Sequence, residues 1–313
     1  MFKLPEQSKL FELLRGRKPD GVFFDLDGTL FERENMLHEA IAQEVRHAIE
    51  YHIRPQGLRR VHPHQVDAAY FIEHFSGAGI RDIYGNILEK TGISKEHYSY
   101  NQFSQFVGQN LDRLLQEAQE GLSEPAKEQG VGLLTSCAYD TLDFIRNIMD
   151  VPVGLGSNGS CLNISLIADC TGLSDFCCRD AYNVVSGDSD FAPKPAPDML
   201  ARLAKNADIK PDQNQKYPYS LFTGNAPSDM RAAKAAGMIA VGILEAAKPE
   251  DRGILHKSLK KAGADIIFER MDNFYDALIA LHQQLQPVVR PVRSEPVYTF
   301  PVPVSIGTPA YEA

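Results

Sequence analysis

The chain has 313 residues, of which 43% are hydrophobic, and 32 basic residues against 41 acidic ones give a formal net charge of −9. This acidic balance argues against nucleic acid or an anionic membrane as a partner, because both need a positive protein surface. No apolar run approaches the ~20 residues of a membrane span. Five cysteines fit no metal-ligand spacing and favour reduced thiols. With no secretory signal expected at the N-terminus, we predict a cytoplasmic protein of about two domains.

Six short apolar runs, each bounded by Gly, Pro or Asp, predict β-strands. They are Gly21–Phe24, Val151–Leu155, Asn183–Val185, Tyr219–Phe222, Ile239–Ile243 and Ile266–Phe268. From the second run onward the strands alternate with helical segments, such as Asp198–Lys205 and Ser228–Ala236. Such alternation is typical of a parallel sheet that is covered on both faces. The predicted fold class is α/β, with a Rossmann-like parallel sheet and helices on both faces.

The gap of about 120 residues between the first two strands has the pattern of helices. Two apolar stripes have helical spacing. The first is Leu37, Ile41, Val45 and Ile49, and the second is Phe103, Phe106, Val107, Leu111, Leu114, Leu115 and Ala118. A crossover between parallel strands needs far fewer residues than this gap contains. We therefore predict an all-helical domain over residues 33–135, inserted into a catalytic core formed by residues 1–32 and 136–285.

The composition changes after Leu285, because six prolines fall in the last 28 residues among valines and few charges. We predict that residues 286–313 form an extended Pro-rich arm outside the sheet. The arm could mediate self-association or be disordered, and the oligomeric state stays open.

Two carboxylates directly follow the first strand, in the run Asp25-Leu26-Asp27-Gly28-Thr29. At this place they point into the crevice at the carboxyl edge of the sheet, where ligands bind in open α/β folds. Buried acids are unfavourable unless cations or a metal ion offset their charge. A plain turn is the alternative, since Asp-Gly is a common turn dipeptide.

Three later segments bring further polar groups to the same edge. Ser157 and Asn158 close the second strand, Lys194 precedes a helix, and Asn225 and Asp229 follow the fourth strand. Oxygen ligands suit a hard cation such as Mg²⁺, while ammonium and hydroxyl groups suit phosphoryl oxygens. The combination predicts a site for a phosphate beside Mg²⁺.

These motifs, in this order and with a long insertion after the first, resemble those of the haloacid dehalogenase superfamily of hydrolases. The resemblance covers Asp25 to Asp229, and the sheet continues to about Phe268. Segment 33–135 resembles the helical, C1-type cap of phosphoglycolate phosphatase-like and β-phosphoglucomutase-like members. The resemblance implies a Mg²⁺-dependent phosphatase that hydrolyses a small phosphorylated metabolite.

The resemblance also implies a role for each motif residue. Asp25 would attack phosphorus and form an aspartyl-phosphate, and Asp27 would act as general acid and then general base. The residues implied to hold the phosphoryl group are Thr29, Ser157, Asn158 and Lys194. The residues implied to hold Mg²⁺ are Asp25, Asp27 through its backbone carbonyl, Asn225 and Asp229. Because Asp27 is the acid that phosphatases and phosphomutases of this superfamily carry, it favours phosphoryl transfer.

Two features leave the function open. Asn225 stands where such phosphatases usually carry a metal-binding Asp, so we expect weakened metal binding. Arg81, in the glycine-bearing segment Phe75–Asp82, could meet a substrate carboxylate or second phosphate, or simply face solvent.

The alternatives to a phosphatase are a phosphomutase of the β-phosphoglucomutase type and a catalytically impaired family member kept for binding or regulation. The acidic run Gly187–Asp190 is interpreted as a loop.

Overall fold

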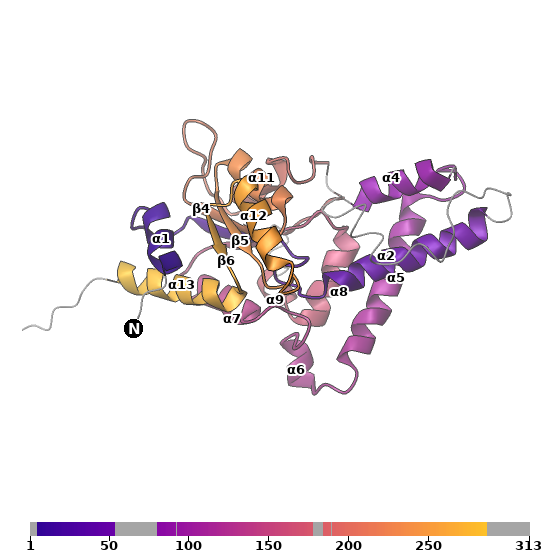
Figure 1. The fold of residues 1–313 in the computed structure, drawn as a ribbon, viewed down its shortest axis with the longest axis horizontal. Helices are drawn as coiled ribbons and strands as arrows, with labels where there is room; N and C mark the ends of the chain where they lie inside the picture. The colour runs from indigo at the N-terminus through magenta and orange to yellow at the C-terminus, as the bar shows by residue number, and fades with distance from the viewer. Residues whose placement is uncertain (1–4, 54–79, 92, 178–183, 189, 287–313) are drawn as a thin grey trace, which may run out of the picture.

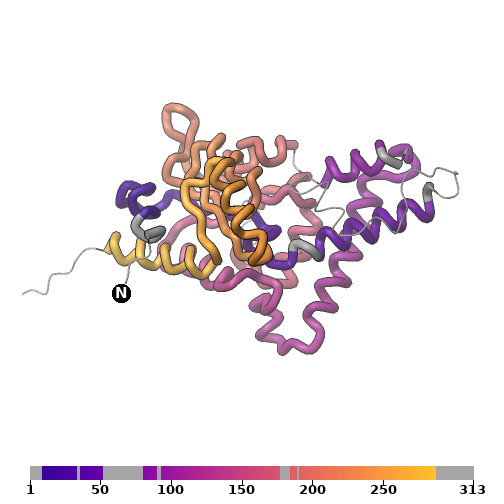
Figure 2. Tube along the Cα trace, in the orientation of Figure 1, coloured from indigo at the N-terminus to yellow at the C-terminus, as the bar shows by residue number. Residues whose placement is uncertain are grey.

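The computed structural model describes residues 5–53, 80–91, 93–177, 184–188 and 190–286 (Figure 1). The Pro-rich arm beyond Gln286, Phe75–Gly79 of the glycine-bearing segment and Asn183 of the third predicted strand lie outside these residues. The described part contains one sheet with helices packed on it and a group of helices extending to one side (Figure 2).

Six parallel strands form the sheet in the order β3-β2-β1-β4-β5-β6. Their bounds are Gly21–Phe24 for β1, Val153–Gly156 for β2, Val184–Val185 for β3, Ser220–Gly224 for β4, Ile239–Ile243 for β5 and Ile266–Phe268 for β6. In the centre, Phe24 of β1 lies opposite Leu155 of β2 and Thr223 of β4. All six predicted strands are present, and the predicted α/β class is confirmed. β1 and its two neighbours therefore end at one edge of the sheet.

Helices cover both faces of the sheet, as predicted (Figure 1). On one face lie α1 (Pro5–Leu13), α7 (Ala138–Asp143), α8 (Cys161–Thr171), α9 (Ser174–Cys177) and α13 (Met271–Leu285). On the other lie α10 (Asp198–Asn206), α11 (Pro227–Ala236) and α12 (Arg252–Ala262). Side chains alternate along β1, so that Val22 and Phe24 join the first apolar layer and Phe23 joins the second. Both faces of the sheet are therefore buried.

A helical insertion lies between β1 and β2. It comprises α2 (Glu34–Ala48), a π-helical turn (Ile49–Ile53), α4 (Ile80–Thr91), α5 (Tyr100–Gln119) and α6 (Glu124–Glu128). The first predicted stripe is buried. In the second, Phe103, Val107, Leu111 and Leu115 are buried, while Phe106 is 36% exposed and Ala118 is exposed, so including these two was wrong. Among the described helices, α5 packs mainly on α2 and α8 and also contacts α4.

The chain enters and leaves the insertion through two segments that lie side by side. The Glu32 N–H donates to the Leu133 carbonyl at 2.8 Å, and the Thr135 N–H donates to the Leu30 carbonyl at 2.9 Å. The Thr135 hydroxyl also donates to the Thr29 carbonyl at 2.8 Å. Because this junction follows β1 directly, the insertion is held at the carboxyl edge of the sheet.

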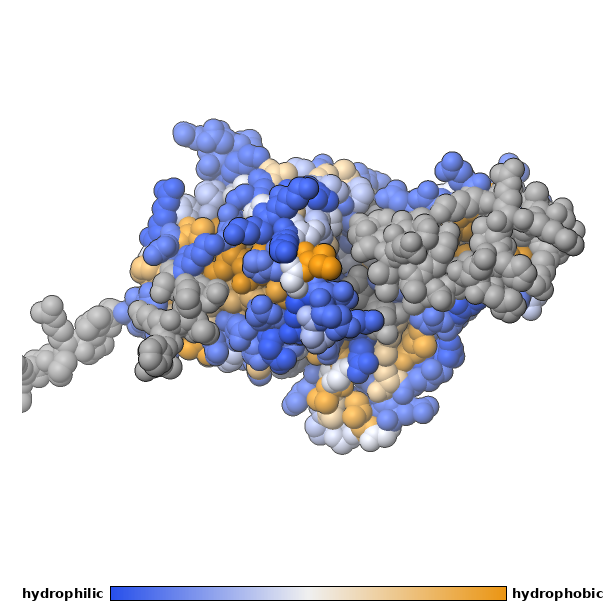
Figure 3. Space-filling model, viewed as in Figure 1, coloured by the Kyte–Doolittle hydropathy of each residue, from blue (hydrophilic) through white to orange (hydrophobic). Residues whose placement is uncertain are grey.

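On the face in Figure 3, the described residues are mainly hydrophilic, with hydrophobic side chains showing between them. Among the described residues, the large apolar side chains that are exposed include Tyr51, Phe106, Val131, Ile148, Leu162 and Ile254. Within the described ranges, no helix has the length and hydropathy that crossing a membrane requires.

Glu44 is a carboxyl buried inside the helical insertion, only 1% exposed, and the Tyr98 hydroxyl donates to it. Burial raises the pKa of Glu44 to about 7, although the hydrogen bond from Tyr98 opposes this rise. A raised pKa in the folded state means that this group stabilises the fold most at low pH. That contribution is lost as the pH rises through about 7.

We therefore expect the difference in free energy of unfolding between Glu44→Gln and wild type to depend on pH. Between pH 4 and pH 8 this difference should shift by about 3 kcal/mol in favour of the variant. The glutamine oxygen can still accept from Tyr98, and it carries no charge to desolvate. Urea unfolding at both pH values measures the difference. Glu96→Gln, at an exposed position, is the matched control and should track wild type; a pH-independent difference for Glu44→Gln would contradict the expectation.

Candidate active site

Asp25 stands at the first position beyond β1, where its N–H donates to the Thr223 carbonyl of β4 at 2.8 Å. Its side chain is nearly buried, and Lys194 Nζ donates to Oδ1 at 2.5 Å. The Thr29 hydroxyl lies 3.4 Å from the other oxygen, Oδ2. Burial raises the pKa of Asp25 to about 7, while the charge of Lys194 opposes the rise. The two oxygens of the Asp25 carboxyl thus have different partners, Lys194 at Oδ1 and Thr29 at Oδ2.

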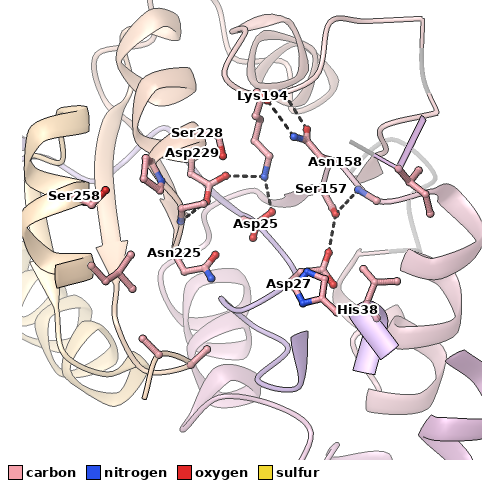
Figure 4. Close-up of a pocket in the computed structure, with 18 of the residues that line it drawn as sticks. Asp25, Asp27, His38, Ser157, Asn158, Lys194, Asn225, Ser228, Asp229 and Ser258 are labelled. Atoms are coloured by element: carbon pink, nitrogen blue, oxygen red, sulfur yellow. Dashed lines mark hydrogen bonds and ion pairs between the residues drawn. The ribbon is translucent and has the colours of Figure 1, made fainter. Parts of the chain in front are cut away.

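Lys194 lies at the centre of the site (Figure 4). Its ammonium contacts Asp25 at 2.5 Å, Asp229 at 2.8 Å and the Gly156 carbonyl at 2.8 Å. Burial would lower the pKa of Lys194, but Asp229 and Asp25 outweigh burial and raise it above its ordinary value. The ammonium therefore stays charged and offsets two buried carboxylates.

Asn158, predicted to bind phosphate, contacts the backbone of Lys194. The Lys194 N–H donates to Asn158 Oδ1 at 2.9 Å, and Asn158 Nδ2 donates to the Lys194 carbonyl at 3.1 Å. These two bonds join the loop after β2 to the loop that carries the lysine. In this arrangement Asn158 positions Lys194, and a direct contact with phosphate stays a prediction.

Asp27 and Ser157 form a second polar pair beside the first. The Ser157 hydroxyl donates to Asp27 Oδ2 at 3.1 Å and accepts from the Gly159 N–H at 2.9 Å. Burial raises the pKa of Asp27, and the hydrogen bond from Ser157 opposes the rise. Oδ1 of Asp27 is buried and has no hydrogen-bond partner within the described part of the chain. A buried carboxyl oxygen without a donor is a suitable place for a proton.

The side-chain oxygen of Asn225 lies near Oδ2 of Asp25, the oxygen that Lys194 does not contact. The Thr29 hydroxyl lies 3.3 Å from Asn225 Oδ1 and 3.4 Å from Asp25 Oδ2, so the two oxygens share one neighbourhood. These donors fit Mg²⁺, which takes oxygen ligands, commonly from one or two carboxylates together with waters and substrate. Asp25 and Asn225 together carry one negative charge, whereas two aspartates at these positions would carry two. Among the described residues, no group of three or more His, Cys, Asp or Glu could hold a metal ion.

Asp229, also predicted to hold the metal, has both oxygens engaged. Oδ1 contacts Lys194, and Oδ2 accepts from the Ala226 N–H at 2.9 Å, at the N-terminus of α11. Gly224 allows this approach, since a Cβ there would lie 2.4 Å from Asp229 Oδ2. In this geometry Asp229 fixes Lys194 and α11, and its place in the metal set stays a prediction.

A cavity of about 500 Å³ opens above these groups. Asp25, Asp27, Ser157 and Lys194 line it, together with side chains from α2, α4 and α12. His38 of α2, which sequence reasoning missed, also lines it, opposite Ser258 of α12 (Figure 4). The only sequence signal for His38 was its position next to Leu37 in the first apolar stripe. The cavity therefore joins the insertion to the polar groups at the sheet edge.

Arg81 is absent from the described lining of this cavity. Its guanidinium stacks on the Tyr100 ring at 4.5 Å, and its Nε lies 3.7 Å from Asp188 Oδ1. Asp188 also accepts from the Tyr100 hydroxyl at 2.5 Å and from the Cys161 N–H at 2.8 Å. Asp188 thus ties the insertion to α8 of the core. A contact of Arg81 with substrate stays a prediction.

The sequence pattern of the haloacid dehalogenase-like hydrolases matches residues 19–237. A phosphoglycolate phosphatase from Shigella boydii is 24% identical over 267 residues, 85% of this chain and 95% of the relative. A hydrolase from Pseudomonas syringae shares the fold with a TM-score of 0.57 and 19% identity, over 83% of this chain and 98% of its own. β-Phosphoglucomutase from Clostridium difficile shares the fold with a TM-score of 0.56 and 15% identity, over 85% of this chain and 98% of its own. The chain belongs to the haloacid dehalogenase-like hydrolases and is thus an enzyme of the hydrolase class.

Proposed function

We propose that this hydrolase is a Mg²⁺-dependent phosphatase that cleaves a small phosphomonoester through an aspartyl-phosphate on Asp25. The observation that carries the proposal is the pairing of two carboxyls with different partners in one cavity. Lys194 contacts Asp25, and Ser157 contacts Asp27. Neighbouring acids in different environments can perform different roles in one reaction.

In the proposed reaction, Asp25 is the nucleophile. Its oxygen attacks phosphorus, the bond to the leaving alcohol oxygen breaks, and an acyl phosphate forms on the carboxylate. Lys194 and Ser157 stabilise the charge on the transferring phosphoryl oxygens. A bound Mg²⁺ would supply the positive charge that keeps Asp25 ionised and balances the phosphate.

Asp27 is the proposed general acid and base. Its raised pKa favours the protonated form that a general acid needs, and Oδ1 is free to hold the proton. Asp27 gives this proton to the leaving oxygen and then takes one from the water that attacks the acyl phosphate. The water oxygen then bonds to phosphorus as the bond between phosphorus and the Asp25 oxygen breaks, which releases phosphate and restores the Asp25 carboxylate.

The residues proposed to hold Mg²⁺ are Asp25, the backbone carbonyl of Asp27, and Asn225. Asp229 would take part through a bound water, because its own oxygens contact Lys194 and the Ala226 N–H. The oxygen-only donor set supports this choice of metal.

We propose that the helical insertion acts as a cap that covers the substrate and excludes water. Its attachment through two adjacent segments and its share of the cavity lining support this role. Cys137, Cys161 and Cys170 are free thiols, which supports the predicted cytoplasmic location. The proposed partner is a small phosphorylated metabolite.

A phosphate-release screen over a panel of phosphometabolites and p-nitrophenyl phosphate, with Mg²⁺, tests the proposal. Asp25→Asn should lower release to the level of a protein-free blank, because an amide is a poor nucleophile, and EDTA should lower wild-type release. A base-labile phosphate on wild-type protein, absent from Asp25→Asn, would identify the acyl phosphate. Asp198→Asn, at an exposed position, is the matched control and should keep full activity.

Two outcomes would contradict the phosphatase proposal. Isomerisation of a sugar phosphate without phosphate release would indicate a phosphomutase instead. Absence of both phosphate release and acyl phosphate on every substrate, with the protein folded, would indicate a binding or regulatory protein.

A further inference from the structure

The cavity has a polar floor at the sheet edge, and its walls are largely aliphatic, although His38 and Ser258 also line them. Six leucine and isoleucine side chains line these walls, namely Leu37, Ile41, Ile80, Ile83, Ile254 and Leu255. Those from α2 and α4 are nearly buried in the core of the insertion and form a fixed wall. On α12, Ile254 is 72% exposed. Covering a water-exposed aliphatic side chain with an apolar group lowers the free energy, because apolar surface is removed from water.

The described lining offers no cation for a second anionic group. Lys194 is the one lysine or arginine in that lining, and its ammonium already pairs with Asp25 and Asp229. Burial lowers the pKa of His38, so its imidazole is neutral near pH 7. Asp251 adds a negative charge near the N-terminus of α12. A carboxylate or second phosphate in this space would lose its water without gaining a counter-charge from the described lining residues.

We infer that the substrate is the phosphate ester of an uncharged, apolar alcohol, whose alkyl or aryl part lies between α2, α4 and α12. The inference rests on the proposed phosphatase function and names the substrate class of that same site. The cavity, about 500 Å³, is within the range of small-molecule sites. The phosphate occupies the polar floor, and the leaving group occupies the aliphatic part.

A series of ethyl, butyl and hexyl phosphates tests this inference, because their leaving alcohols have similar intrinsic reactivity. The value of kcat/KM should rise about fourfold per methylene that enters the cavity. The same hexyl chain ending in a carboxylate should be hydrolysed at least about tenfold less efficiently than hexyl phosphate. Equal kcat/KM values for the three alkyl phosphates would overturn the inference. A wild-type preference for the carboxylated ester over hexyl phosphate would also overturn it.

A positive charge on the α12 wall should weaken the preference for the plain chain over the carboxylated one. Ile254→Lys offers a cation where the carboxylated chain would end, and we expect the ratio of carboxylated to plain hexyl ester to rise about tenfold. Ile148→Lys, at a position 55% exposed and outside the cavity lining, should leave that ratio unchanged. Equal ratios for both variants would remove Ile254 from the substrate wall and count against the inference.

Binding measurements separate this inference from the proposed function. Hexylphosphonate and its terminally carboxylated analogue cannot be hydrolysed, and calorimetric titration into wild-type protein with Mg²⁺ compares their Kd values. Tighter binding of the plain chain supports the apolar site even if no Asp25-dependent hydrolysis is found, in which case the phosphatase proposal alone fails. Equal or weaker binding of the plain chain overturns the inference whatever the activity.

Discussion

Lys194→Met is expected to lower the free energy of unfolding by about 3–5 kcal/mol at neutral pH and to reduce phosphatase activity about 10²- to 10³-fold. The ammonium lies between Asp25 and Asp229, and the side chains of all three residues are less than 10% exposed. Methionine fills a similar volume, so the loss arises from two buried carboxylates left without a cation and not from a cavity.

The stability loss should depend on pH with a definite sign. Burial already raises the pKa of Asp25 to about 7 against the opposing charge of Lys194, and removal of the lysine raises it further. A raised folded-state pKa favours the fold at low pH, and this contribution is lost as the pH rises. The difference from wild type should therefore be smaller at pH 5 than at pH 8.

Urea unfolding in EDTA at these two pH values measures the effect without bound metal. Lys205→Met, on the exposed side of α10, is the control and should change stability by less than about 0.5 kcal/mol. A loss below about 1 kcal/mol, or one equal at both pH values, would show that the ammonium does not offset the two buried charges.

The strands could be predicted because each is an apolar run that the parallel sheet buries on both faces. The start of β2 could not, since the predicted run includes Pro152. The Pro152 carbonyl accepts from the Val22 N–H, but proline has no N–H to donate, and β2 begins at Val153. Helix α1 was not predicted, because its nine residues mix charged and apolar side chains without a long helical repeat.

The convergence of Asp25, Ser157 and Asn225 could be predicted, because the ends of neighbouring parallel strands meet at one edge. Which side chains pair there could not, since pairing depends on distances between segments far apart in sequence. Sequence reasoning left Arg81 open between a contact with substrate and a position facing solvent, and interpreted Asp188 as part of a loop. The structure brings these two residues together through contacts between the insertion and the core.

Asn225→Asp is expected to lower the Kd for Mg²⁺ at least about tenfold, about 1.4 kcal/mol. Asn225 Oδ1 and Asp25 Oδ2 share the Thr29 hydroxyl as a neighbour, so a new carboxylate adds its charge beside the proposed metal position. At 4 Å and an effective dielectric of about 20, two unit charges interact by about 4 kcal/mol. Repulsion from Asp25 and Asp229 offsets part of this gain.

Calorimetric titration of Mg²⁺ without substrate measures this affinity directly, and Asn214→Asp, which adds the same charge at an exposed position, is the control. In EDTA the Asn225→Asp variant should be less stable than wild type, because a third carboxylate joins the site. Mg²⁺ should then stabilise it more than wild type, since a ligand that binds the folded state raises stability by mass action. Unchanged or weaker Mg²⁺ binding would remove Asn225 from the metal site and leave Asp25 as its one side-chain ligand.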